Sequence, residues 1–260
     1  MDRPPPADLL AVAREAAAAG AAVLLPRFGS ERATGAKSSP TDVVSEADLA
    51  SERAIRDVLS ARRPGDGILG EEGTGDVPGS TGLRWVVDPL DGTVNYLYGL
   101  PQWCVSVAVE DGEQTLAGVV HDPVRDEAFC ATADGPATLG GEPLRGSARS
   151  ELARALVATG FGYESDVRRV QAAAVARLLP EVRDIRRAGS AALDLAWLAA
   201  GRFDAFYERG VKHWDVAAGL LVCSRAGLAV RRLQALDGAP PGVLVAPEPL
   251  VDPLLALVGS

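Results

Sequence analysis

The sequence predicts an α+β fold, with helices at the start of the chain and a largely antiparallel sheet across its first half. Residues 6–28 are rich in alanine and leucine, which indicates a packing helix that ends near Gly29. The apolar runs 104–109 and 116–120 are separated by a turn sequence, which predicts a hairpin. A further strand around 127–131 extends this meander.

Residues 43–48 are predicted to open into a second helix that continues to about Ser60. Ser45 can cap this helix, and Asp48 stands at the capping-box position three residues later. Taken alone, the segment leaves a purely structural role for Asp48 as plausible as a functional one.

A short apolar strand is predicted at residues 68–73, where it ends in Glu71 and Glu72. Adjacent side chains on a strand point to opposite faces, so one glutamate can face a site while the other faces solvent or supports it. A solvated acidic turn is the alternative interpretation.

The stretch 83–110 contains two carboxylates and a hydroxyl close together at the end of a predicted strand. Its run Trp85-Val86-Val87 indicates a buried strand, which Asp88 ends and Pro89 is expected to stop. Asp91 follows three positions after Asp88, and Gly92-Thr93 adds a flexible turn and a hydroxyl. Carboxylates at a strand end, beside free backbone N–H groups, suit a cation that bridges to a phosphate.

The second half of the chain alternates between strands and helices. The expected strands are 156–160, 182–186, 203–208 and 243–246, and the expected helices are 167–179, 191–200, a helix from about Asp215 to 226, and a last helix at the end of the chain. An aspartate placed as Asp215 is ordinarily an N-cap. We expect a single domain over residues 1–260, with an N-terminal subdomain of about 1–150 and a C-terminal subdomain of about 151–260.

The composition limits the classes of function. The chain has 260 residues, 47% of them hydrophobic, and a formal net charge of -9. That charge argues against broad binding of nucleic acid or anionic membranes, which requires basic faces. An anionic substrate would therefore need a metal to reverse the local field.

No apolar run approaches the roughly 20 residues that cross a bilayer. The proline-rich start lacks the order of a signal peptide, so a cytoplasmic location is the default expectation. Cys104, Cys130 and Cys223 are odd in number and far apart, which favours reduced core residues over a disulfide or a zinc site.

Four carboxylates stand at predicted strand ends or helix starts: Glu71, Asp88, Asp91 and Asp215. Their clustering favours oxygen-ligated Mg²⁺ over zinc, because no Cys or His set has metal-ligand spacing. His121 and His213 are the only histidines; the first is expected in a turn and the second to pack beside the site.

Three motifs resemble, in the same order, the motifs of the inositol monophosphatase family of metal-dependent sugar phosphatases. They are Gly70-Glu71-Glu72, the run from Trp85 to Tyr96 that contains Asp-Pro-Leu-Asp-Gly-Thr, and Trp214-Asp215-Val216-Ala217-Ala218-Gly219. Lys37-Ser38-Ser39-Pro40, Asp48 and Gly189-Ser190-Ala191-Ala192 also fit, so the resemblance covers nearly the whole chain.

The resemblance implies a layered α/β/α/β/α sandwich of the inositol monophosphatase and fructose-1,6-bisphosphatase type, usually dimeric and Mg²⁺-dependent. By position, Glu71, Asp88 and the Leu90 carbonyl would hold a first metal, and Asp88, Asp91 and Asp215 a second, with Glu71 also at a weaker third site. Thr93 would pair with Asp48 near the attacking water, and the Gly92 and Thr93 amides would bind phosphate. Asp91, Ala191, Glu208 and Asp215 would lie near substrate hydroxyls, and a ligand role for Asp215 outweighs a cap alone.

The substrate implied is inositol 1-phosphate or a similar small polyol phosphate, and lithium sensitivity is expected. Relatives that act on histidinol phosphate, fructose 1,6-bisphosphate or 3′-phosphoadenosine 5′-phosphate share the metal site, so segments 160–169 and 208–213 are expected to make the choice. A non-catalytic metal- or phosphate-binding module is the alternative from another class. One departure from the family follows Gly227, where a segment shorter than usual puts the C-terminal edge and the dimer contacts in doubt.

Overall fold

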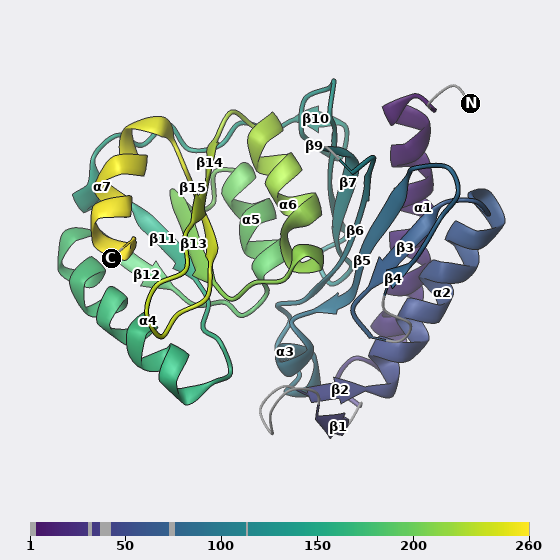
Figure 1. Ribbon diagram of the computed structural model, residues 1–260, viewed down its shortest axis with the longest axis horizontal. Helices are drawn as coiled ribbons and strands as arrows, with labels where there is room; N and C mark the ends of the chain where they lie inside the picture. Colours follow the sequence, from purple (N-terminus) through teal and green to yellow (C-terminus); the bar gives the residue numbers. More distant parts are fainter. Residues whose placement is uncertain (1–3, 31–32, 37–42, 73–75, 113, 260) are drawn as a thin grey trace.

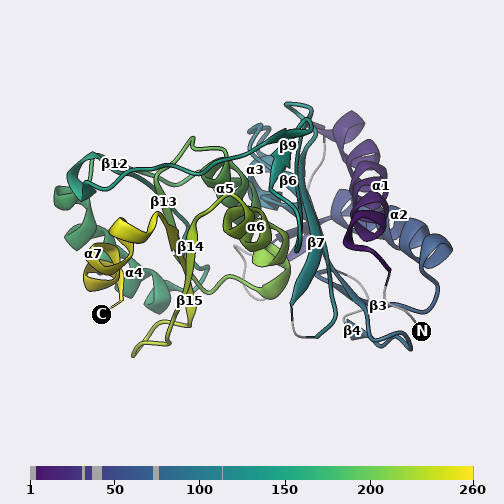
Figure 2. The same cartoon turned by 90° about the horizontal axis from the view of Figure 1, so that it is seen from above.

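The computed structural model describes residues 4–30, 33–36, 43–72, 76–112 and 114–259. Its helices and sheets form five layers in the order α/β/α/β/α, which Figure 1 shows from one end to the other and Figure 2 shows from above. The predicted layered sandwich is therefore confirmed. The segment Lys37-Ser38-Ser39-Pro40 lies outside the described residues.

The larger sheet has eight strands in the order β10-β9-β8-β7-β6-β5-β3-β4, and every neighbouring pair is antiparallel except β3 with β5. This confirms the largely antiparallel first half. Its strands are β3 Gly67–Gly70, β4 Asp76–Val77, β5 Arg84–Asp91, β6 Cys104–Glu110, β7 Thr115–Asp122, β8 Glu127–Thr132, β9 Thr138–Leu139 and β10 Glu142–Pro143. A separate short pair, β1 Ala33–Ala36 and β2 Val43–Ser45, precedes it.

The second sheet has five strands in the order β12-β11-β13-β15-β14. They are β11 Leu156–Thr159, β12 Asp184–Arg186, β13 Ala205–Arg209, β14 Ala229–Leu233 and β15 Gly242–Ala246. The sequence did not lead us to expect β14, which pairs with β15 from Ala229 opposite Ala246 to Leu233 opposite Gly242. The short segment after Gly227 therefore still completes the sheet.

The helices make the other three layers. One outer layer contains α1 Pro6–Leu24 and α2 Glu46–Arg62, the middle layer α5 Ala191–Ala199 and α6 His213–Arg225, and the other outer layer α4 Ser165–Leu178 and α7 Glu248–Val258. Short helices are α3 Thr93–Leu97 and the 3₁₀ turns Leu25–Arg27, Leu152–Arg154 and Leu179–Glu181. Helix α5 is apolar on nearly all sides because it packs between two sheets, and one core cluster contains side chains of both.

We expected no apolar segment long enough to cross a bilayer, and this expectation was wrong for the first helix. The segment Pro6–Arg27 is 22 residues long with a mean hydropathy of 1.6, which is enough to cross a membrane by length and composition. Scattered charges such as Arg14 and Glu15 hid this in the sequence. Leu9, Ala13 and Ala16 are at most 1% exposed and belong to a cluster shared with α2 and the large sheet, so this face of the helix is core.

Two further local predictions are corrected. Pro89 does not stop its strand, because β5 continues to Asp91. His121 lies in β7, opposite Val105 and Ala128, and the turn begins only after Asp122. The three cysteines are buried and free, as predicted.

Candidate active site

A cavity of about 1400 Å³ lies where the carboxyl-terminal ends of β3, β5 and β13 and the start of α6 converge. Every predicted site residue except Asp48 lines it: Glu71, Asp88, Leu90, Asp91, Gly92, Thr93, Ala191, Glu208 and Asp215. Residues up to 144 positions apart in the sequence, Glu71 and Asp215, thus meet in one place.

A bulge in β5 puts Asp88 and Asp91 on the same face of the sheet. Side chains three apart on a regular strand point to opposite faces. Here Asp88 pairs with Ser106 and Asp91 with Cys104, so β5 carries one extra residue against β6. Pro89 falls within this irregular segment, where a missing N–H costs no ladder hydrogen bond.

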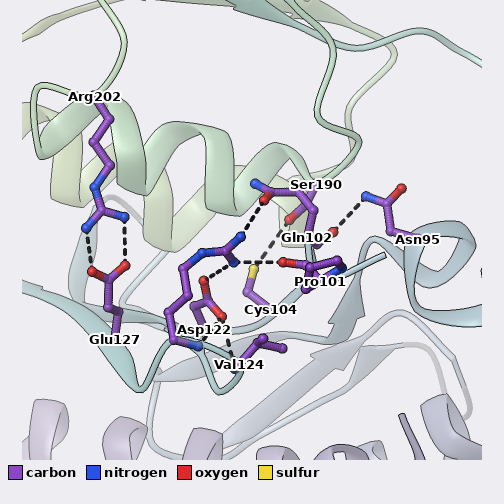
Figure 3. A network of polar contacts seen from close by, with 10 residues as sticks. Asn95, Pro101, Gln102, Cys104, Asp122, Val124, Glu127, Ser190 and Arg202 are labelled. Carbon is purple, nitrogen blue, oxygen red and sulfur yellow. Dashed lines mark hydrogen bonds and ion pairs between the residues drawn. The ribbon is translucent and has the colours of Figure 1, made fainter. Parts of the chain in front are cut away.

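The Asp91 carboxylate is held by the loop that leads into α5. Its Oδ2 accepts hydrogen bonds from the Ser190 hydroxyl at 2.7 Å and from the Ala192 N–H at 2.7 Å. Figure 3 shows Ser190 beside Cys104, whose Sγ lies 3.6 Å from the Ser190 Oγ. The loop is held in turn by Asn95, whose amide donates to the carbonyls of Gln102 and Ala188 at 2.7 and 2.8 Å.

Helix α2 presents one polar face to this site. Ser45 caps the helix and Asp48 completes the capping box, as predicted. Asp48 uses Oδ2 for the Ser45 N–H and hydroxyl, and its Oδ1 lies 2.9 Å from the Thr93 hydroxyl. The buried Asp48 carboxylate can therefore both cap α2 and bind the Thr93 hydroxyl.

The next turn of α2, on the same polar face, supports the β5 bulge and the segment with Glu71 and Glu72. The Ser51 hydroxyl donates to the Pro89 carbonyl at 2.9 Å, and Glu52 accepts the Glu72 N–H at 2.7 Å. Glu52 is 3% exposed and also binds Arg56. Of the two adjacent glutamates, Glu71 faces the cavity and Glu72 is tied to α2 through its backbone.

Asp215 is not the N-cap of α6. Lys212 occupies that position, and Asp215 is the third helical residue, from which its Oδ2 accepts the Lys212 N–H at 2.7 Å. The carboxylate thus satisfies a free N–H at the helix start and still faces the cavity. The His213 ring, on the same first turn, binds Glu110 at the end of β6.

Like charge and burial dominate the electrostatics of the cavity. Burial, followed by repulsion from Glu71, Asp91 and Asp215, raises the pKa of Asp88 well above its usual value. Burial also raises the pKa of Asp215 strongly, with Asp91 and Glu71 adding to the effect. The pKa of Asp91 is raised by burial to about 6, against the opposing hydrogen bonds from Ser190 and Ala192.

Two further buried carboxyl groups, Glu208 of β13 and Asp194 of α5, lie near the cavity carboxylates. Burial and then the charge of Asp91 raise the pKa of Glu208 to about 8, while Arg187 opposes the shift. Asp194, 1% exposed, has its pKa raised by burial and then by Glu208, and its Oδ1 has no hydrogen-bond partner among the described residues.

Several supporting residues were not predicted from the sequence. Ser51 and Glu52 follow Asp48 at helical spacing, so the polar face of α2 was a usable signal. Asn95 stands in the motif that runs from Trp85 to Tyr96, but its hydrogen bond to the distant Ala188 carbonyl has no local signal. Arg187 and Asp194 have no sequence pattern of this kind.

Comparison with known proteins identifies the class. The profile of the inositol monophosphatase family matches residues 6–256. The Inositol-1-monophosphatase SuhB of Mycobacterium tuberculosis is 45% identical over 270 residues, covering 96% of this chain and 93% of that protein. The Nus factor SuhB of Xylella fastidiosa is 46% identical over 191 residues, covering 73% of this chain and 68% of that protein.

Solved structures agree with the sequence comparison. The extragenic suppressor protein suhB from Bartonella henselae superposes with a TM-score of 0.89 at 33% identity, covering 96% of this chain and 98% of that one. Mycobacterium tuberculosis SuhB gives a TM-score of 0.82 at 39% identity, with 98% and 96% covered. The sequence and the fold are those of a phosphatase, a hydrolase of phosphoric monoesters. The chain belongs to the inositol monophosphatase family.

Replacing Glu208 by Gln should change the pH dependence of stability in protein kept free of metal by a chelator. The ordinary pKa of this carboxyl is 4.5 and its folded pKa is about 8. Wild type therefore loses stability as the pH rises between these values, because only the unfolded state ionises freely. The variant has no such group to ionise.

Urea unfolding from about pH 4 to pH 8 measures this difference. We expect the stability of Glu208→Gln relative to wild type to increase steadily across that range. A difference that is the same at every pH would show that Glu208 ionises as freely in the folded protein as in the unfolded chain.

Proposed function

We propose that the protein is a Mg²⁺-dependent phosphatase that hydrolyses inositol 1-phosphate, or a similar small polyol phosphate, by attack of water. The observation that carries the proposal is the meeting of Glu71, Asp88, Asp91 and Asp215 around one cavity. Burial and repulsion between these groups raise the pKa values of Asp88, Asp91 and Asp215. Divalent cations remove that repulsion, and carboxylate and carbonyl oxygens are the donors that Mg²⁺ prefers.

The donor set fits Mg²⁺ by its chemistry. In the described part of the chain, no three His, Cys, Asp or Glu side chains are gathered tightly enough to form a metal-binding group by themselves. The cavity carboxylates nevertheless interact, because a hydrogen bond with Glu71 and the charges of Glu71, Asp91 and Asp215 all raise the pKa of Asp88. Glu71, Asp88 and the Leu90 carbonyl would hold one ion, Asp88, Asp91 and Asp215 another, and Glu71 a weaker third.

Bound Mg²⁺ would supply positive charge that offsets the phosphate charge and lowers the pKa of the attacking water. The protein's own groups would orient that water. Asp48, fixed by two hydrogen bonds from Ser45, would accept a proton through the Thr93 hydroxyl that it contacts. No covalent nucleophile is required.

The phosphate would bind beside the start of α3. Gly92 has φ +97°, a conformation open to glycine, and precedes the first helical residue Thr93. The backbone N–H groups of these two residues would donate to the phosphate oxygens. On the other side of the cavity, Asp91, Ala191, Glu208 and Asp215 would contact the hydroxyls of the leaving polyol.

The names of relatives support a polyol phosphate, since several are called Inositol-1-monophosphatase. Histidinol phosphate and small sugar or nucleotide phosphates are the alternative substrates within the same reaction. A non-catalytic metal- or phosphate-binding module is disfavoured by the complete carboxylate set. Two relatives are called Nus factor SuhB, which leaves a role outside hydrolysis as a second candidate; the net charge of -9 favours a protein partner over nucleic acid in such a role.

We further propose a homodimer in the cytoplasm, built from single-domain chains whose two subdomains divide near residue 150, with catalysis sensitive to Li⁺. The shared core between the two sheets supports treating each chain as one folding unit.

A substrate panel tests the proposed function directly. Phosphate release is measured from inositol 1-phosphate, histidinol phosphate, fructose 1,6-bisphosphate and 3′-phosphoadenosine 5′-phosphate, with Mg²⁺, with a chelator, and with added Li⁺. We expect Mg²⁺-dependent release with the highest kcat/KM for inositol 1-phosphate. Release from none of them by protein that still binds metal would favour the binding module.

Asp91→Asn should abolish Mg²⁺-dependent release, by on the order of 100-fold or more, because it removes a ligand charge but not core volume. The amide oxygen can still accept from Ser190 and Ala192, so the thermal unfolding midpoint should stay near that of wild type. Asp57→Asn, the same change at an exposed position of α2, is the control. Turnover of Asp91→Asn equal to that of Asp57→Asn would reject the metal assignment.

A further inference from the structure

Two segments border the side of the cavity where the polyol would lie. One is the loop after β11, which contributes Gly160, Phe161 and Gly162, and the other is the end of β13 at Glu208. The two segments are in close contact at Gly160, where an added Cβ atom would lie only 2.2 Å from the Glu208 carboxylate. The position of that carboxylate therefore depends on where the loop runs.

Gln171, on the inner face of α4, connects these two segments. Its Oε1 accepts the Gly162 N–H at 3.0 Å, and its Nε2 donates to the Arg209 carbonyl at 3.2 Å. The side chain is 5% exposed, and its orientation is set by its partners, since an N–H needs an acceptor and a carbonyl needs a donor. Arg168, one turn earlier, donates to the Gly162 carbonyl at 2.6 Å.

The β13 end of this connection is fixed from several directions. The Arg209 guanidinium donates to the carbonyls of Gln234, Pro240 and Val258 at 2.6, 3.2 and 3.1 Å. Arg209 also pairs with Gly242 of β15. Gln171 therefore ties the loop to Arg209, which is held rigidly in place, and Glu208 immediately precedes Arg209.

We propose that Gln171 is a positioning residue that sets substrate selectivity, by holding the loop at Gly160 and Gly162 in register with Glu208. Gln171 is one layer behind the described residues that line the large cavity, so it acts through Gly162 and Arg209. The inference rests on the proposed function, because Glu208 selects a substrate only if it meets a hydroxyl of the leaving group.

The two ends of the cavity should respond differently to a change at Gln171. The phosphate end is built from β5, α2 and α3, which Gln171 does not contact through either of its hydrogen bonds. A displaced loop would misplace Glu208 while leaving the carboxylates and Thr93 where they are. Hydrolysis of an ester whose leaving group has no ring hydroxyls should then be unaffected.

The experiment compares inositol 1-phosphate with p-nitrophenyl phosphate. Gln171→Met removes both hydrogen bonds at similar volume, and Gln171→Glu keeps an acceptor for Gly162 but loses the donor to Arg209. Gln114→Met, at an exposed position of the β6–β7 hairpin, is the matched control. For Gln171→Met we expect KM for inositol 1-phosphate to rise about tenfold, with kcat for p-nitrophenyl phosphate within about twofold of wild type.

Gln171→Glu should show a smaller rise in the same KM, and Gly160→Ala, which displaces the Glu208 carboxylate directly, should match Gln171→Met. Equal losses on both substrates, or an unchanged preference in Gln171→Met and Gly160→Ala, would overturn the inference. Wild-type protein that hydrolyses p-nitrophenyl phosphate without preferring inositol 1-phosphate would instead contradict the proposed substrate class.

Discussion

The structure depends on holding mutually repelling carboxylates at one buried point. Asp88 is 1% exposed, and burial and then the charges of Glu71, Asp91 and Asp215 raise its pKa. Unpaired buried charge is strongly unfavourable, so such a group persists only with protons or a cation to neutralise it. The packing and hydrogen bonds around the cavity can be understood as the means by which the fold keeps these groups together.

Each carboxylate is positioned by an element that also belongs to the core. The β5 bulge turns Asp88 and Asp91 to one face, and the middle helices, packed between the sheets, bring Ser190 and Asp215 to the same place. Ser190, which donates to Asp91, lies beside Cys104, and Figure 3 shows the neighbouring hydrogen bond from Asn95 to the Gln102 carbonyl. A site made from segments far apart in the sequence thus gains its geometry from one shared core.

Much of this was predictable from the sequence, for a physical reason. Periodic apolar runs defined most helices and strands, and the carboxylates lay at their ends. The bulge was not predictable, because nothing in Asp-Pro-Leu-Asp shows which residue β6 leaves unpaired. The local sequence around Asp215 suggested an N-cap, and the family motif a ligand; in the structure Asp215 accepts the Lys212 N–H from the third helical position and faces the cavity. The bonds of Gln171 depend on the tertiary meeting of α4 with β13, which has no local signature.

The central claim is that the carboxylate cluster is a cation site with protons to release. Titration calorimetry of chelator-treated protein with Mg²⁺, in buffers of different ionisation enthalpy, tests it most directly. Because burial and like charge raise the pKa of Asp88, and raise that of Asp91 to about 6, Mg²⁺ binding near pH 6 should be saturable and should release protons, and Asp88→Asn should weaken it strongly. Absence of binding, or binding by Asp88→Asn equal to that of wild type, would contradict the account.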